Sequence, residues 1–259
     1  MKSAKAELIL VLVTLLAGAG WIFSKEALGG LPPLLFIGIR FFLAGLVLAL
    51  VCRKQWALLQ QRQTLVRCLL LGLVMSVAMI FWILGLHYSS HLGEGAFITS
   101  LGVVFVPLLA RWVFGDRPPA SIWLALPVAV AGLASLSLSR GMHFEAGQWY
   151  FLLAALTFAV QFNLVSRMTQ AIPATLLTSV QLVVVGVCVL LVSSLVERWP
   201  DVVSKDIWGW VAASILIATS LRFLLQTYAQ SLASVSHAAV IMNLEPVWAA
   251  LFAAIWFAE

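Results

Sequence analysis

Four ionisable residues interrupt long apolar runs in this sequence: Lys25, Arg40, Arg222 and Glu245. Charged side chains at membrane depth are costly, and they usually mark transport paths or proton relays. Glu245 is followed at once by Pro246, which removes a backbone N–H and kinks a helix. We therefore expect the kink to line a cavity, with Glu245 as a candidate proton or ion-coupling group.

Arg222 and Glu245 lie at equal distances from the turn "SLASVSH". Each is about eight residues into its helix, or roughly 12 Å at about 1.5 Å per residue, so they can meet in the membrane. The internal repeat described below pairs them with Met79 and Gly102, so both charges are absent together from the first half. An unpaired buried charge costs several kcal/mol, which favours an Arg222–Glu245 ion pair. The pair has either a mainly structural role or faces the transport path.

Lys25 and Arg40 lie at equal distances from the turn "GGLPP", and two cations at one level would attract an anionic substrate. Lys25 has a second interpretation, in which it snorkels to the interface and pairs with Glu26. For Arg40 the functional and structural interpretations both stay open. Its partner in the repeat, Gln181, is also polar.

Neutral polar and aromatic side chains within the apolar runs are weaker candidates for substrate contacts. They equally serve as hydrogen bonds between helices, worth roughly 0.6–2 kcal/mol each, or as simple packing. The candidates are Gln161, Asn163, Gln226, Asn243, Trp21, Trp82 and Trp248.

The composition places all these residues in a bilayer. The chain is 63% hydrophobic and 10% charged, whereas soluble domains are typically about 45–50% apolar and about 25% charged. Runs of about 20 apolar residues predict membrane-spanning helices. They occur at Leu8–Leu28, Leu34–Cys52, Cys68–Leu86, Ala96–Phe114, Ile122–Leu138, Trp149–Met168, Thr175–Leu195, Ile207–Ala229 and Ala238–Ala258.

The basic residues near the ends of these spans predict the orientation. With the N-terminus inside, nine basic residues lie on the cytoplasmic side and four on the other, as the positive-inside rule requires. We expect a multi-pass protein of the bacterial inner (cytoplasmic) membrane with a cytoplasmic N-terminus. The first apolar run is interpreted as a transmembrane helix rather than a cleaved signal.

An internal repeat predicts the architecture. A shift of 143 aligns Leu101 with Leu244 and Phe114 with Phe257, and a shift of 141 aligns Gly45 with Gly186. The repeat unit has an odd number of helices, five, so the chain leaves it on the opposite side of the membrane. The second copy would therefore enter the membrane from the opposite face. The prediction is an all-α polytopic membrane protein with inverted five-helix repeats at residues 1–143 and 144–259. Nine transmembrane helices are present and the tenth is apparently missing. We infer that shortening of the chain or its gene removed the tenth helix; a natural nine-helix variant is the alternative.

Several stretches in order resemble the EamA family of the drug/metabolite transporter superfamily. They are "GWIFSKEAL", "IRFFLAGLVLAL", "LHYSSHLGEGAFITSLGVVFVPLLA", "LLQTYAQ" and "MNLEPVWAALFAAIWFAE". The resemblance implies a ten-helix inner-membrane transporter of small metabolites that works by alternating access, often as an exporter. Arg222 is a departure, since a small or apolar residue is usual there.

The function predicted is therefore a secondary transporter, and a probable exporter, of small organic metabolites or amino-acid-like solutes. No catalytic residue, metal site or cofactor is predicted, and no basic motif suggests nucleic acid. A non-transporting membrane scaffold is the alternative, and a membrane enzyme is less favoured because the four histidines fall near loops. Substrate identity, direction, coupling ion and oligomeric state do not follow from the sequence.

Overall fold

The computed structural model of the 259-residue chain describes residues 2–89, 92–116 and 146–257, with isolated positions between 120 and 131. Each regular element in these ranges is helical. Eight of the helices described there are long and apolar enough to cross a membrane. This confirms the predicted all-α polytopic membrane protein. Most of the predicted span Ile122–Leu138 lies outside the described residues.

In the first half, prolines and glycines set the helix boundaries. Pro33 occupies the first turn of its helix, where the missing N–H is not needed. Gly115 ends another helix with a left-handed φ of 72°, which glycine adopts without a Cβ clash. The elements are α1 (Lys2–Ala27), α2 (Pro33–Val51), the 3₁₀ segment η1 (Arg53–Gln60), α3 (Arg62–Tyr88), α4 (Leu92–Ser100) and α5 (Gly102–Phe114).

The second half has a similar order of elements. They are α7 (Ala146–Met168), α8 (Ala174–Val196), α9 (Lys205–Ala213), the π-helical η2 (Ser214–Leu221), α10 (Arg222–Gln230), α11 (Val235–Met242) and α12 (Glu245–Phe257). However, η1 has no counterpart among them, and three segments, α9, η2 and α10, stand where the first half has α3. Adding 143 to the bounds of α5, 102–114, gives the bounds of α12, 245–257. Adding 141 to the first residue of α2, 33, gives the first residue of α8, 174.

Three predicted spans are less regular than the sequence indicated. The span expected at Ala96–Phe114 is broken at Leu101, which separates α4 from α5. The last span is interrupted at Asn243 and Leu244, directly before α12 begins at Glu245. The span expected at Ile207–Ala229 carries a π-helical segment in its middle. Apolar composition reports the length of a span and not its internal hydrogen-bond register, so the break at Leu101 and the π-helical segment were not predicted, whereas Pro246 did predict a kink in the last span.

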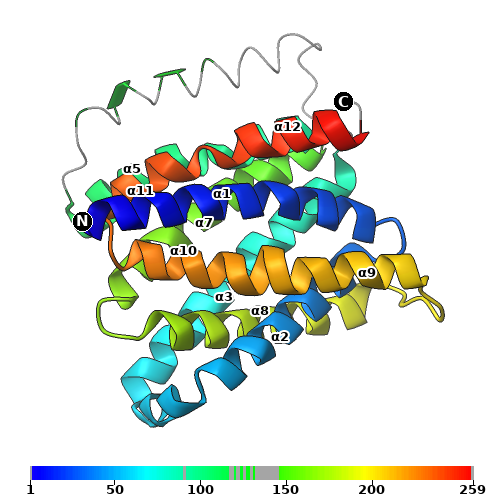
Figure 1. Ribbon diagram of the computed structural model, residues 1–259, viewed down its shortest axis with the longest axis horizontal. Helices are drawn as coiled ribbons and strands as arrows, with labels where there is room; N and C mark the ends of the chain where they lie inside the picture. The colour runs from blue at the N-terminus through cyan, green and yellow to red at the C-terminus, as the bar shows by residue number, and fades with distance from the viewer. Residues whose placement is uncertain are drawn as a thin grey trace.

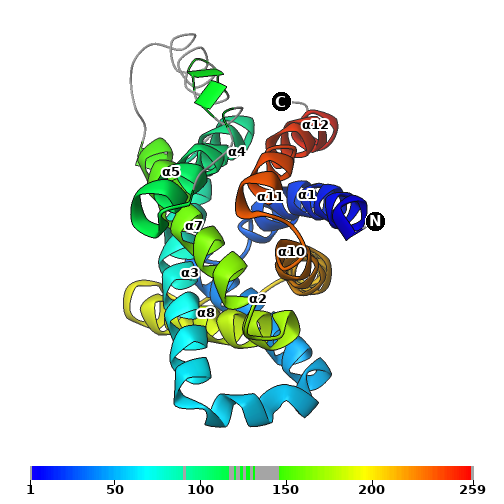
Figure 2. The same cartoon turned by 90° about the vertical axis from the view of Figure 1, so that its left-hand side faces the viewer.

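The helices form two groups, which Figure 2 shows from one end of the molecule. Each group contains the first helix of one half together with later helices of the other half. α1 packs against α9 to α12, whereas α7 packs against α3, α4 and α5. The groups are also joined where α4 packs on α12 and α11 packs on α5. Sequence-contiguous five-helix bundles are therefore not the packing units, because α1 and α7 are exchanged between them.

The most extensive helix–helix contact joins α2 to α8, which are equivalent in the repeat. A Cβ on Gly45 would lie 2.6 Å from the Val183 backbone nitrogen, and one on Gly186 would lie 2.4 Å from the Phe42 Cα atom. Because 42 and 45 shifted by 141 give 183 and 186, the two contacts are mirror counterparts. Gly38 meets Leu190 while Gly45 meets Val183, so the helices run antiparallel. The two glycines allow the backbones to approach closely, as small residues do in bilayers.

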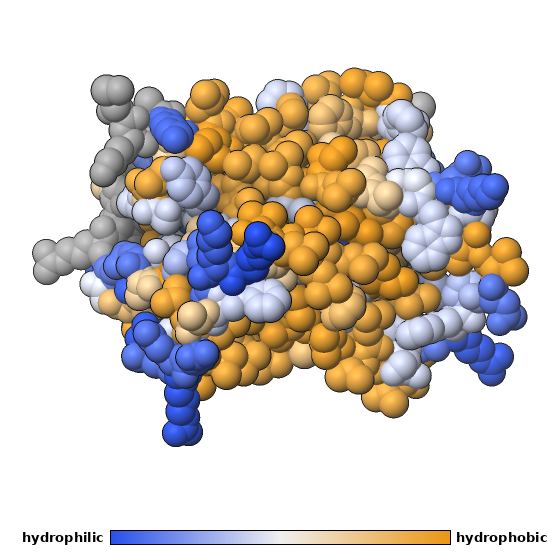
Figure 3. Space-filling model, turned by 60° about the horizontal axis from the view of Figure 1, so that its bottom comes forward, coloured by the Kyte–Doolittle hydropathy of each residue, from blue (hydrophilic) through white to orange (hydrophobic). Residues whose placement is uncertain are grey.

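The surface has the division expected of a membrane protein. The helices lie side by side along the long axis (Figure 1). Figure 3 shows a broad hydrophobic band across the middle, with hydrophilic residues gathered mainly toward the two ends. Large apolar side chains such as Leu8, Leu195 and Ile255 are exposed, which is favourable only where lipid replaces water.

Candidate functional site

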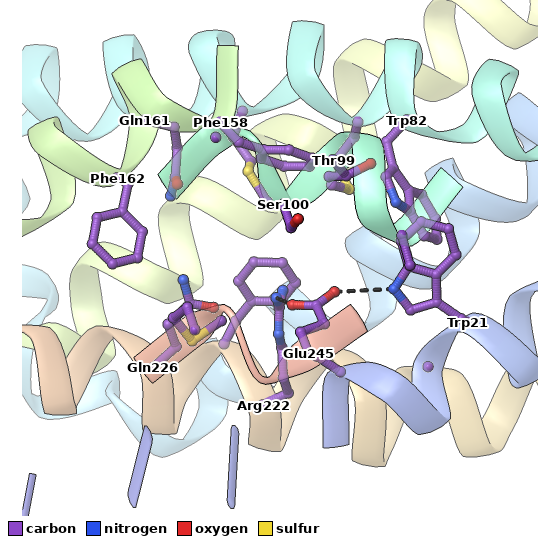
Figure 4. A pocket seen from close by; sticks show the side chains of 18 of the residues that line it. Trp21, Trp82, Thr99, Ser100, Phe158, Gln161, Phe162, Arg222, Gln226 and Glu245 are labelled. Atoms are coloured by element: carbon purple, nitrogen blue, oxygen red, sulfur yellow. Dashed lines mark hydrogen bonds and ion pairs between the residues drawn. The ribbon is translucent and has the colours of Figure 1, made fainter. Parts of the chain in front are cut away.

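A cavity of about 990 Å³, counting all space not filled by atoms and its open mouth, lies between the two groups of helices. Figure 4 shows aromatic rings and a few polar side chains converging on it. Its aromatic and sulfur-containing wall residues are Trp21, Phe41, Met75, Met79, Trp82, Phe158, Phe162, Phe223 and Met242. Its polar and charged lining residues are Arg40, Thr99, Ser100, Gln161, Arg222, Gln226 and Glu245.

Both interrupted helices contribute their breaks to this cavity. Thr99, Ser100 and Gly102 line it from the α4–α5 junction. Met242, Glu245 and Pro246 line it from the α11–α12 junction. Pro246 has no N–H to donate to the Met242 carbonyl, and Leu244 donates instead to Ile241 at 3.0 Å. The predicted kink at Pro246 is thus present, and it faces the cavity as expected.

An ion pair occupies the centre of the cavity. The Arg222 Nη2 atom lies 3.3 Å from Glu245 Oε2, and Trp21 donates from Nε1 to Glu245 Oε1 at 3.0 Å. The Arg222 guanidinium also lies 4.3 Å from the centre of the Phe223 ring. The predicted Arg222–Glu245 pair is confirmed. Glu245 is held from two sides, by a cation from α10 and by an indole N–H from α1 (Figure 4).

Arg40 approaches the same cavity from α2 and anchors the π-helical segment. It donates from Nη1 to Ser24 Oγ at 2.8 Å, from Nη2 to the Ala218 carbonyl at 3.2 Å, and from Nε to Thr219 Oγ1. A π-helix leaves carbonyls displaced from their usual partners, and such segments occur often at functional sites. The equivalent stretch of the first half, 71–78, is regular α-helix. Arg40 therefore binds a π-helical segment that the first half lacks in the equivalent stretch. This segment ends at Leu221, directly before Arg222.

Seven of the twelve candidate residues line the cavity, namely Trp21, Arg40, Trp82, Gln161, Arg222, Gln226 and Glu245. Five do not, for reasons of local hydrogen bonding and packing. Asn163 donates to the carbonyls of Val106 and Ala159, at 3.0 and 2.9 Å. Trp248 donates to Thr14 Oγ1 at 3.2 Å.

The other three candidates outside the lining have other surroundings. Gln181 is buried in α8, the helix that packs on α2. Asn243 lies in the break before α12. Lys25 donates to the Ser89 carbonyl at 3.4 Å, and its predicted partner Glu26 accepts from Trp256 instead. Lys25 and Arg40 thus have different hydrogen-bond partners, and of the two only Arg40 lines the cavity.

The lining contains repeat-equivalent residues from both halves. Pairs separated by 143 are Met75 and Ala218, Met79 and Arg222, Ala96 and Ala239, Thr99 and Met242, and Gly102 and Glu245. Pairs separated by 141 are Ala17 and Phe158, Gly20 and Gln161, and Trp21 and Phe162. Thr99, Ser100, Phe158 and Phe162 also line the cavity but were not predicted from the sequence. The repeat held a usable signal for Phe162, which is the counterpart of the candidate Trp21.

In the described part of the chain, no group of three or more His, Cys, Asp and Glu side chains is placed to hold a metal ion. His237 lies 3.3 Å from Glu7 at an exposed position, and His91 and His143 lie outside the described residues.

Comparison with known proteins agrees with this architecture. The chain is 27% identical to an uncharacterized transporter of Archaeoglobus fulgidus, over all of this chain and 80% of the relative. It is 21% identical to an uncharacterized transporter of Synechocystis, over 96% of this chain and 81% of the relative. A solved crystal structure has the same fold, with a TM-score of 0.76 and 19% identity over 99% of this chain and 89% of that chain. The sequence model of the EamA-like transporter family matches residues 4–138 and again 145–259. The chain therefore belongs to the EamA-like transporter family, within the drug/metabolite transporter superfamily.

Proposed function

We propose that the chain is a secondary transporter that exports small organic solutes across a prokaryotic cytoplasmic membrane. Family membership makes it a membrane transporter, and export is what the family resemblance implies. The observation that carries the proposal is the central cavity at the breaks of two interrupted helices. In transporters, interrupted helices at corresponding positions of two halves point to the substrate site.

The mechanism we propose is alternating access by inverted repeats. The doubled family match, the antiparallel α2 and α8, and the pairs of equivalent lining residues support it. If equivalent residues from two inverted halves surround one site, each half can close the side that the other opens. The substrate would then remain at the cavity while the helix groups rock around it.

Transport by the purified protein in proteoliposomes tests the proposal. A panel of radiolabelled metabolites, including amino acids, organic acids and amines, is measured for uptake and efflux with and without a pH gradient. We expect saturable movement of at least one solute class. Movement of none of them above protein-free vesicles would support the non-transporting scaffold instead.

A matched pair of variants relates transport to the cavity. Ser100→Trp fills the space at the α4–α5 break, so it should abolish transport. Leu153→Trp places the same side chain at an exposed position of α7 and should leave transport unchanged. Equal transport rates for the two variants would show that the transport path does not pass through this cavity.

A further inference from the structure

The charges around the cavity do not cancel. Its charged lining residues within the described ranges are Arg40, Arg222 and Glu245, a formal sum of one positive charge. Glu245 already accepts from Arg222. Arg40 is 5% exposed and its three hydrogen bonds all go to neutral oxygens, two hydroxyls and one carbonyl. A buried cation without an anion is costly in a medium of low dielectric constant.

The cavity also offers polar side chains to a ligand. Arg222 and Gln226 line it from α10, and the Arg222 side chain is 15% exposed. Gln226 follows Arg222 by four residues on α10, so both side chains lie on one face. Gln161 lines the cavity at 5% exposure from α7 (Figure 4). A few polar side chains in a mostly apolar wall fix the orientation of a ligand and provide specificity.

The Arg222–Glu245 contact leaves room for a second carboxylate. It joins one nitrogen to one oxygen at 3.3 Å, which is longer than the roughly 2.7–2.9 Å of a strong charge-assisted bond. Arginine binds a carboxylate best through two parallel N–H donors. The guanidinium carries five N–H donors, and the Arg222 side chain is 15% exposed and lines the cavity, so donors besides Nη2 remain for a ligand.

The rest of the wall suits an apolar body. Trp21 and Trp82 meet edge to face, with ring centres 5.0 Å apart, and Phe158 and Phe162 face the cavity from α7 (Figure 4). Gly20, Gly102 and Ala218 also line the cavity. Such a wall contributes affinity through the burial of apolar surface.

Resting on the proposed function, we infer that the transported solute is a small organic monoanion: one carboxylate on an apolar or aromatic body. The carboxylate binds Arg222 in place of, or beside, Glu245 and neutralises the excess charge of Arg40. The apolar body lies between the tryptophans and phenylalanines. A cationic solute would raise the net positive charge of the cavity. A zwitterion, with no net charge of its own, would leave that positive charge uncompensated.

Four probes of one shape test the charge requirement by isothermal titration to the full chain in detergent. They are 3-phenylpropanoate, 3-phenylpropanol, 3-phenylpropylammonium and phenylalanine. We expect the carboxylate to bind at least about tenfold more tightly than the alcohol, roughly the effect of one charge-assisted hydrogen bond. We expect the ammonium compound to bind more weakly than the alcohol. Equal or tighter binding of the ammonium compound or of phenylalanine, or no binding by any of the four, would overturn the inference.

Two variants separate ligand recognition from structure. Glu245→Gln removes the competitor for Arg222, so 3-phenylpropanoate should bind more tightly, by about tenfold. Adding Arg222→Gln to that variant should weaken the carboxylate by at least about tenfold, because the donors of Arg222 are lost and only the charge of Arg40 remains. Arg167→Gln, in the exposed Arg167–Asp116 pair, is the control and should change nothing. If Glu245→Gln weakens the carboxylate, the carboxylate does not bind where we infer.

The outcome is independent of the proteoliposome assay. Transport of amines or neutral solutes without binding of the carboxylate would overturn the inference and leave the transporter function standing. Binding of the carboxylate without movement of any solute would overturn the transporter function and leave the site.

Discussion

Removing Arg222 alone should harm the protein more than removing Arg222 and the charge of Glu245 together. The side chains of the pair are only 15% and 22% exposed, so each charge depends on its partner for compensation. Breaking a buried pair typically costs about 3–5 kcal/mol, whereas replacing both charges is often close to neutral. Because 1 kcal/mol corresponds to about 2–4 °C for a chain of this size, Arg222→Ala should lower Tm by about 6–12 °C, the lower end of that cost.

The assay is unfolding in detergent, followed by intrinsic tryptophan fluorescence. The Arg222→Ala plus Glu245→Gln variant should lose no more than about 4 °C, equivalent to roughly 1 kcal/mol. Arg167→Ala breaks the Arg167–Asp116 pair, whose side chains are 35% and 45% exposed, so it should cost at most about 1 kcal/mol. Equal losses from the single and double variants would show that the pair does not stabilise the fold, and would refute the reasoning.

Three further perturbations test other contacts by the same unfolding assay. Trp21→Phe keeps the ring but removes the donor to Glu245 Oε1, and should cost about 1.5–3 kcal/mol, as for a hydrogen bond to a charged group; no change in Tm would mean that this bond is not formed in solution. Gly186→Ala forces a Cβ to within 2.4 Å of the Phe42 backbone, whereas Gly209→Ala meets no atom within 4 Å, so only the first should lose about 1–3 kcal/mol; similar stability of both would place α2 and α8 further apart. Glu197→Gln weakens the acceptor for the backbone N–H groups of Leu34 and Leu35, both at 2.8 Å, and should cost about 1 kcal/mol, as other helix caps do; an unchanged Tm would argue against this cap.

Much of the fold was predictable because the bilayer imposes one dominant constraint. Backbone groups in lipid must be satisfied within each segment, so apolar runs of sufficient length become helices. The span predicted at Thr175–Leu195 is helical from Ala174 to Val196. The shift of 143 residues found in the sequence also appears in the structure, where α5 begins at Gly102 and α12 at Glu245.

The irregular elements were not predictable in the same way. The π-helical segment Ser214–Leu221 is apolar throughout apart from three hydroxyl residues, and nothing local distinguishes it from an α-helix. Its carbonyl at Ala218 accepts from Arg40, which is 178 residues away. Such a contact appears only after the chain has folded.

The site was predictable where charge carried the signal. Arg40, Arg222 and Glu245 line the cavity, as expected of ionisable groups that are costly in lipid. Neutral residues gave no comparable guide: Gln161 faces the cavity, whereas Asn163, two residues later, donates to the Val106 carbonyl. The direction of a neutral side chain depends on which helix packs beside it.

Access to the cavity from each side of the membrane is the most direct test of alternating access. In a variant lacking Cys52, Cys68 and Cys188, Ser100→Cys places one thiol in the cavity wall. A charged, membrane-impermeant maleimide is then added to oriented vesicles from either side. The same change at Leu153, an exposed position in α7, is the control and should stay unlabelled. We predict that the cysteine at position 100 is labelled from both sides; labelling from one side only, or from neither, would contradict a transport path through this cavity.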